Sequence, residues 1–136
     1  MQLFSQKPAC DGVEGAYYES FASASALVAA ANAVLPEITN GRQVCEHLDH
    51  PLLIPITEQW IRNVSYGLSS LVHIFNPKLI VLGGGILQND RLFQRIDACT
   101  RSMLMPGFEC VCLSQAKLGN QAGMIGAAML AQEIIQ

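Results

Sequence analysis

The sequence predicts an α/β fold that is mostly helical and contains one short parallel strand–helix–strand unit. Three observations lead to this class. Apolar residues in segment 57–75 recur at the spacing of a helix with one buried face. The run "KLIVLGG" at 78–84 is apolar without alternation, which is typical of a short buried strand. A second strand-like run, "ECVCLS" at 109–114, follows after a helical segment.

Composition and charge narrow the class of protein further. The 136 residues are 51% hydrophobic and 14% charged, which suits one globular unit with an apolar core. The net charge of -3 leaves no basic footprint, so no nucleic-acid partner is expected. No apolar run approaches the roughly 18 residues that span a bilayer, and the amino terminus lacks the pattern of a signal peptide. We therefore expect a cytoplasmic protein without a membrane partner.

The first helix is predicted from about Tyr18 to Leu35, after a loop over residues 1–16 that contains Pro8, Gly12 and Gly15. Small residues on one side of this helix leave room for another backbone. Pro36 stops the helix. Its apolar face is formed by Phe21, Leu27, Val28, Ala31 and Leu35.

Two further helices follow before the first strand. Thr39 with Asn40-Gly41 indicates a turn, and Val44, Cys45 and Leu48 form the inner side of a short helix. The segment Thr57–Phe75 is the clearest helix of the chain, and the proline after Asn76 ends it. Its apolar positions are Trp60, Ile61, Val64, Leu68, Leu71, Val72 and Phe75.

The strand at 78–84 is predicted to be central and buried on both faces. Asp90 is the expected N-cap of the next helix, which runs to about Met105. The second strand should then lie parallel to the first, with a right-handed crossover. A last helix is predicted over Asn120–Ile135, with Gly119, Gly123 and Gly126 at its start. Two strands are too few to bury both faces of a sheet, so we expect either a borrowed sheet or the tail of a longer protein.

The cysteines and histidines form no metal or redox motif. None of the five cysteines makes a CxxC pair, and reduced thiols are expected. Cys110 and Cys112 alternate with apolar residues on one strand, which favours buried small residues over a reactive pair. His47 and His50, with Cys45, are interpreted as a solvated surface.

The three glycines Gly83, Gly84 and Gly85 allow two interpretations. Glycines after a buried strand let a backbone approach a ligand, and the amides at a helix start can bind an anion. However, the spacing matches neither the GxGxxG nor the GxxxxGK[ST] motif. Taken alone, these glycines favour a tight turn over a phosphate cradle.

Three sequence stretches, taken together in this order, favour the phosphate cradle over the tight turn. They are "DGVEGAYYESFASASAL" near the start, "FNPKLIVLGGGI" in the middle and "LGNQAGMIGAAMLA" near the end. Together they closely resemble the carboxy-terminal part of the ROK family, which comprises sugar kinases and sugar-responsive transcriptional repressors. The resemblance implies the carboxy-terminal part of an actin-like, ribonuclease-H-like ATPase domain, incomplete over residues 1–136.

The resemblance also implies the ligands. Gly83, Gly84 and Gly85 match the family's glycines beside the adenosine and phosphates of ATP, which a sugar kinase uses with Mg²⁺. Glu19 matches the family's glutamate that accepts hydrogen bonds from sugar hydroxyls. A carboxylate suits that task because it can accept from two hydroxyls at once. From the residues alone, Glu19 is an acid favoured by the dipole of a helix start.

Two departures from the family pattern limit what the chain can do. The family's zinc-binding stretch retains only Cys10 here, so no family-type zinc is expected and the chain resembles the zinc-lacking branch. The family's catalytic aspartate and its amino-terminal phosphate loop have no counterpart, so we expect no catalytic residue in this chain and no activity from it alone.

Three function classes stay open. The missing zinc cysteines and the intact glycine triplet favour the carboxy-terminal portion of an ATP-dependent hexose or glucoside kinase. The second class is the effector-binding part of a sugar-responsive repressor. The third is a non-catalytic remnant that mediates association through its apolar helices, and a homo-oligomer is expected.

Overall fold

The computed structural model describes residues 17–117, 121, 124–125, 128–130 and 132. The predicted loop over 1–16, with Cys10, and most of the predicted helix over Asn120–Ile135, with its three glycines, lie outside the described residues. The assigned elements are α1 (Glu19–Ala22), α2 (Ala24–Val34), α3 (Gly41–Glu46), α4 (Ile54–Phe75), β1 (Leu79–Leu82), the 3-10 helix η1 (Gly85–Gln88), α5 (Asp90–Ser102) and β2 (Cys112–Gln115).

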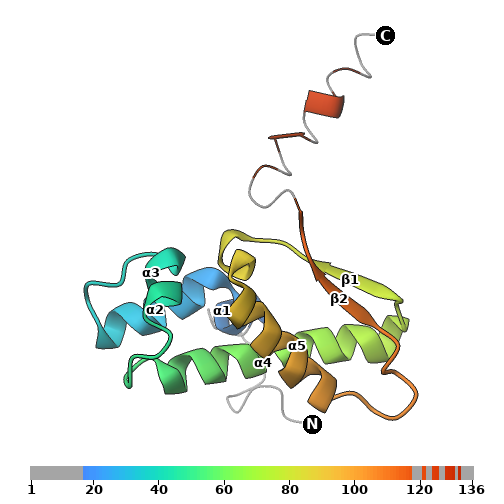
Figure 1. Cartoon of the computed structure of the whole chain (residues 1–136), viewed down its shortest axis with the longest axis horizontal. Helices are drawn as coiled ribbons and strands as arrows, with labels where there is room; N and C mark the ends of the chain where they lie inside the picture. The colour runs from blue at the N-terminus through green and yellow to red at the C-terminus, as the bar shows by residue number, and fades with distance from the viewer. Residues whose placement is uncertain (1–16, 118–120, 122–123, 126–127, 131, 133–136) are drawn as a thin grey trace, which may run out of the picture.

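The long helix α4 organises the molecule. Helices α1, α2 and α3 gather at one end of α4, α5 packs along it, and the strands β1 and β2 lie over its other end (Figure 1). The buried face of α4 includes Trp60, Ile61, Val64, Leu68 and Val72. The sequence predicted this stripe correctly except at its end, where Leu71 is 45% and Phe75 is 71% exposed.

Strands β1 and β2 pair in parallel, from Leu79 opposite Cys112 to Leu82 opposite Gln115. This confirms the predicted strand–helix–strand unit. The expectation that the first strand is buried on both faces is wrong. Leu79 is 53% and Val81 is 56% exposed, whereas Ile80 and Leu82 pack against the core. Within the described residues, α4 and α5 cover only one face of the sheet.

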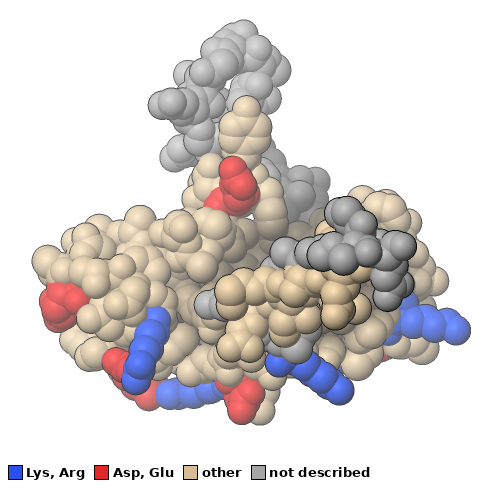
Figure 2. Space-filling model, turned by 90° about the horizontal axis from the view of Figure 1, so that it is seen from above, with Lys and Arg blue, Asp and Glu red and all other residues tan. Residues whose placement is uncertain are grey.

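Few charged side chains are visible on the face of the molecule that is seen from above (Figure 2). Viewed from above, most of the visible surface consists of uncharged side chains, and the Lys, Arg, Asp and Glu side chains lie mainly towards its margin (Figure 2). The exposed side chains of Leu79 and Val81 add apolar area to the sheet, and exposed apolar patches are typical of contacts with further protein. None of the helices in the described part of the chain is both long enough and apolar enough to cross a membrane.

The predicted first helix is in fact two helices. Ser23 has an extended backbone, with φ -73° and ψ 157°, and its side chain accepts a 3.1 Å hydrogen bond from the amide of Ala26. This local bond caps α2, and it competes with a continuous helix in the way that serine commonly does. The break separates α1, which carries Glu19, from α2.

Other boundaries also differ from the prediction. Strand β2 begins at Cys112 rather than at Glu109. Helix α4 begins at Ile54 rather than Thr57, because Pro55 occupies the first turn, where its missing N–H costs nothing. Asn89, not Asp90, caps α5, and its side chain accepts from the amide of Leu92 at 2.9 Å. Helix α5 ends at Ser102 rather than near Met105.

The expected burial of Cys110 and Cys112 is also wrong. Both residues are exposed, while their neighbours Val111 and Leu113 are buried. Strand residues alternate between faces, and the core lies on the side that Val111 and Leu113 occupy. The thiols therefore face away from the core.

Candidate functional site

The glycine triplet forms a loop at the carboxyl end of β1. Gly83 follows the strand directly, Gly84 precedes η1 and Gly85 is the first residue of η1. The 3-10 helix lies between this loop and α5, so the triplet does not lead straight into the long helix. Ile86, in the 3-10 helix, is only 8% exposed, and its side chain packs into the core beside the loop.

Position 84 requires glycine because of its backbone dihedral angles, and not because a side chain there would clash with neighbouring atoms. Its φ is 115° and its ψ is 145°, a region that residues with a Cβ rarely adopt. A Cβ added to Gly84 would meet no heavy atom within 4 Å. The conformation is that of a sharp turn, and the space beside it is open to a ligand.

The glycine loop is braced from the side of α3. A Cβ at Gly41 would lie only 3.3 Å from Cδ1 of Ile86, so α3 and η1 approach closely because position 41 is glycine. The thiol of Cys45 lies 3.9 Å from the carbonyl oxygen of Ile86. Burial, and then the charge of Glu46, raise the pKa of this thiol, so it remains protonated at neutral pH. Cys45 is therefore part of the packing rather than a nucleophile.

Side chains at the end of β2 brace the loop from the other side. The amide nitrogen Nε2 of Gln115 donates to the carbonyl of Leu87 at 2.8 Å and to Oδ1 of Asp90 at 3.2 Å. Nε2 of Gln88 donates to the carbonyl of Ala116 at 3.2 Å. These contacts tie η1 and the start of α5 to β2. No sequence pattern marks Gln115 and Gln88, because only the pairing of the strands brings them close to the loop.

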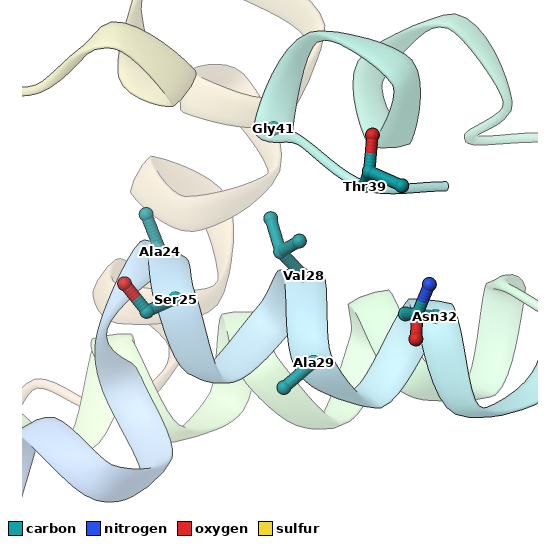
Figure 3. Close-up of a pocket in the computed structure, with 7 residues that line it drawn as sticks. All are labelled: Ala24, Ser25, Val28, Ala29, Asn32, Thr39 and Gly41. Atoms are coloured by element: carbon teal, nitrogen blue, oxygen red, sulfur yellow. The ribbon is translucent and has the colours of Figure 1, made fainter. Parts of the chain in front are cut away.

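An open pocket lies between α2 and the segment before α3. Its volume is about 560 Å³, within the range of small-molecule sites. Ala24, Val28 and Asn32 point from α2 toward the segment that carries Thr39 and Gly41 (Figure 3). The lining residues are Ala24, Ser25, Val28, Ala29, Asn32, Thr39 and Gly41.

Asn32 holds the two walls of this pocket in place. Its Nδ2 donates to the carbonyls of Pro36 and Ile38, both at 3.0 Å. Gly41 lines the pocket and lies close to Ile86, so the pocket is next to the 3-10 helix η1 that follows the glycine loop. One sequence feature pointed toward this pocket. The small residues on one side of α2 predicted that another backbone approaches closely there.

Glu19 lies in the first turn of α1 and is exposed to solvent. It is not on the same element as the glycine loop. Instead, a chain of packed elements connects them: α1 contacts α2, α2 contacts α3, and α3 contacts η1. Glu19 and the glycine loop are therefore linked only indirectly, through α2, α3 and η1.

The described residues contain no group of three or more His, Cys, Asp or Glu side chains that could hold a metal ion. Nδ1 of His47 lies 2.9 Å from the carbonyl oxygen of Gln43, and Nδ1 of His50 accepts from the amide of Leu52 at 3.3 Å. These local contacts explain the two histidines. Cys10, which the zinc expectation concerns, lies outside the described residues.

The fold and this loop define an α/β protein whose ligand site is expected at the carboxyl ends of its parallel strands. The sequence matches the ROK family over residues 1–134. The chain therefore belongs to the ROK family.

Several proteins that resemble this chain are sugar kinases. An N-acetyl-D-glucosamine kinase from Pectobacterium carotovorum is 35% identical over 63 residues, which are 46% of this chain and 21% of that protein. The crystal structure of a ROK family glucokinase from Streptomyces griseus, in complex with glucose and AMPPNP, is similar with a TM-score of 0.71 and 27% identity. This similarity covers 85% of the present chain and 44% of the glucokinase.

A ROK hexokinase from Thermus thermophilus is similar with a TM-score of 0.70 and 32% identity, over 90% of this chain and 42% of the hexokinase. These neighbours confirm the predicted actin-like ATPase fold. The chain spans less than half the length of the relatives that it matches.

Proposed function

We propose that this chain is the carboxy-terminal portion of an ATP-dependent sugar kinase, in which it supplies the adenosine side of the nucleotide site and one sugar contact. The kinase relatives support this assignment over the repressor alternative. The observation that carries it is the open glycine loop at the end of β1, with a pocket beside it.

The geometry of the loop fits a nucleotide. The open space beside Gly84 allows phosphate or ribose atoms to approach the backbone, and any side chain there would introduce strain. The neighbouring pocket has the size and the small lining residues that suit a planar base. We assign Gly83, Gly84 and Gly85 to the adenosine and phosphates, and the pocket on α2 to the base.

Glu19 is the proposed sugar ligand. Its carboxylate is exposed, so a sugar can reach it, and a carboxylate is acceptor-only when ionised. Two adjacent hydroxyls of a hexose can donate to its two oxygens, which orients the sugar as well as binding it.

The chain supplies positioning rather than chemistry. The bound ATP with its Mg²⁺ supplies the phosphoryl group and neutralises the charge on it. No residue of this chain matches the family's catalytic aspartate, so the general base is expected elsewhere in the complete kinase. We therefore expect that the chain alone binds nucleotide weakly and does not phosphorylate sugars.

Calorimetric titration of the chain with Mg-ATP tests the proposal. We expect micromolar to millimolar binding that is lost in Gly84→Val. The matched control is Gly107→Val, because Gly107 also has a positive φ, of 96°, and follows α5 rather than β1. If the unsubstituted chain gives no heat, the nucleotide site exists only in the complete protein. If both variants lose binding equally, the assignment of the loop is wrong.

A further inference from the structure

Helix α1 cannot hold its own orientation. It contains only four residues, Glu19–Ala22, and none of them is buried. Isolated helices shorter than about 12 residues are marginal in water, because nucleation costs more than a few hydrogen bonds return. The direction of the Glu19 side chain therefore depends on contacts from outside the helix.

Helix α4 supplies those contacts at the far end of α1. Nδ2 of Asn63 donates to the carbonyl of Phe21 at 3.2 Å. The indole Nε1 of Trp60 donates to the carbonyl of Ser23 at 2.8 Å. Both bonds hold the carboxyl end of α1, two and four residues beyond Glu19.

Tyr18 holds the other end, directly before Glu19. Its hydroxyl donates to the carbonyl of Val64 at 3.0 Å, although the two residues are 46 positions apart. Burial raises the pKa of this hydroxyl, which the backbone of Gly67 partly offsets, so it is a protonated donor at neutral pH.

The absence of a side chain at Gly67 leaves the space that the ring of Tyr18 occupies. A Cβ at Gly67 would lie 2.9 Å from Cε2 of Tyr18, and closer still to the hydroxyl oxygen and Cζ. No real Cβ tolerates such contacts, so the tyrosine occupies the space that glycine leaves on α4. Helix interiors disfavour glycine, and here the close approach of Tyr18 accounts for it.

We propose that Tyr18, seated on Gly67 and bonded to Val64, is a positioning residue that fixes the direction of the Glu19 carboxylate toward the sugar. We call this contact the Tyr18 latch. The inference rests on the proposed role of Glu19. It adds a specific claim, that sugar affinity depends on a hydroxyl that does not itself touch the sugar.

The test compares steady-state kinetics of variants in the complete kinase that contains this chain. Tyr18→Phe removes only the hydroxyl, and we expect the sugar KM to rise roughly five-fold, the factor for one neutral hydrogen bond, while the KM for ATP stays unchanged. The matched control is Tyr17→Phe, since Tyr17 is 71% exposed and lies on the same segment. It should change neither constant.

Gly67→Ala tests the same contact from the side of α4, by filling the space that the Tyr18 ring occupies. It should raise the sugar KM at least as much as Tyr18→Phe, because the added methyl displaces the ring. In a Tyr18→Ala background the same glycine substitution should have no further effect, since no ring is left to displace. Hydrogen exchange of the amides of residues 20–23 should be faster in Tyr18→Phe than in Tyr17→Phe, which reports the latch independently of activity.

Glu19→Gln separates the two ways in which the inference can be wrong. If it leaves the sugar KM unchanged, Glu19 is not a sugar ligand, and the positioning role is overturned with it. If it raises the sugar KM and Tyr18→Phe does not, the role of Glu19 stands and the latch alone is overturned. A rise in the KM for ATP equal to that for sugar would also overturn the latch, because general loosening affects both ligands.

Discussion

The indole nitrogen of Trp60 donates a 2.8 Å hydrogen bond to the carbonyl of Ser23, and this bond joins the first half of α4 to the break between α1 and α2. Ser23 is the N-cap of α2, and its carbonyl also accepts from the amide of Leu27 at 3.2 Å, so it receives both a backbone and a side-chain hydrogen bond. Trp60 is only 5% exposed and fills the core at the same place. One residue therefore anchors both the core and the segment that carries Glu19.

Replacing Trp60 by Phe should lower the free energy of unfolding by about 1–2 kcal/mol, because the hydrogen bond to Ser23 and part of the core volume are lost. Urea unfolding followed by circular dichroism measures this change. Arg62→Ala is the control, since Arg62 is exposed on the same helix. Equal stability of Trp60→Phe and the unsubstituted chain would show that the bond does not hold the break.

Gly84→Ala should destabilise the chain by about 1–3 kcal/mol, the cost of a positive φ for a residue with a Cβ. Gly83→Ala is its neighbouring control, because a Cβ there meets only Cβ of Ala116 at 3.9 Å and the backbone has no positive φ. Thermal unfolding of both variants measures the difference. A loss of stability in Gly83→Ala as large as in Gly84→Ala would contradict the backbone explanation.

Ala29→Leu should weaken binding of Mg-ATP by roughly ten-fold, because the larger side chain fills part of the pocket proposed for the base. The matched control is Ala30→Leu, one position along α2, where the residue is exposed and does not line the pocket. Calorimetric titration compares the two. Equal Mg-ATP affinities of the two variants would show that the base does not bind in the pocket on α2.

Gln115→Ala should leave the carbonyl of Leu87 without its side-chain donor and cost about 1 kcal/mol of stability. Faster hydrogen exchange at the amides of Leu87 and Asn89 should accompany the loss, since both amides bond within η1. Gln94→Ala, on the exposed side of α5, serves as the control. Unchanged exchange in Gln115→Ala would mean that β2 does not brace the glycine loop.

The ion pair between Asp49 and Arg91 makes the stability depend on pH, and the sign of this dependence can be predicted. A hydrogen bond from Arg91 lowers the pKa of the Asp49 carboxyl below its ordinary 3.8. The pair therefore contributes stability that is present above pH 3.8 and is lost as the pH falls through the lowered pKa. NMR titration of the carboxyl carbon of Asp49 should give a higher pKa in Arg91→Gln. Arg42→Gln, which breaks a different pair, should leave this pKa unchanged.

Local chemistry was sufficient to predict most elements. The period of Trp60, Ile61, Val64 and Leu68 identified α4, and Asn40 was placed correctly at the turn where its side chain now accepts from the amide of Gln43 at 3.0 Å. The errors fell where two local rules compete. Asn89 and Asp90 are both good caps, and a sequence contains no term that separates them when they are adjacent.

Burial of the strands was less predictable. The apolar run of β1 suggested cover on both faces, yet Leu79 and Val81 are exposed in the described part of the chain. A residue's hydrophobicity reports its preference for burial, whereas its burial depends on which layers are present. Similarly, Gly67 gave no signal in the sequence, because its role is to make room for a tyrosine 49 positions earlier.

By itself, the sequence determined the α/β class, the long amphipathic helix, the parallel strand–helix–strand unit and membership of the ROK family, because these depend on residue types at short spacings along the chain. The tertiary structure alone decided that Gln115 braces the glycine loop, that Gly41 brings the pocket beside Ile86, and that Tyr18 rests on Gly67. These contacts join residues far apart in the chain, so they exist only once the helices have packed.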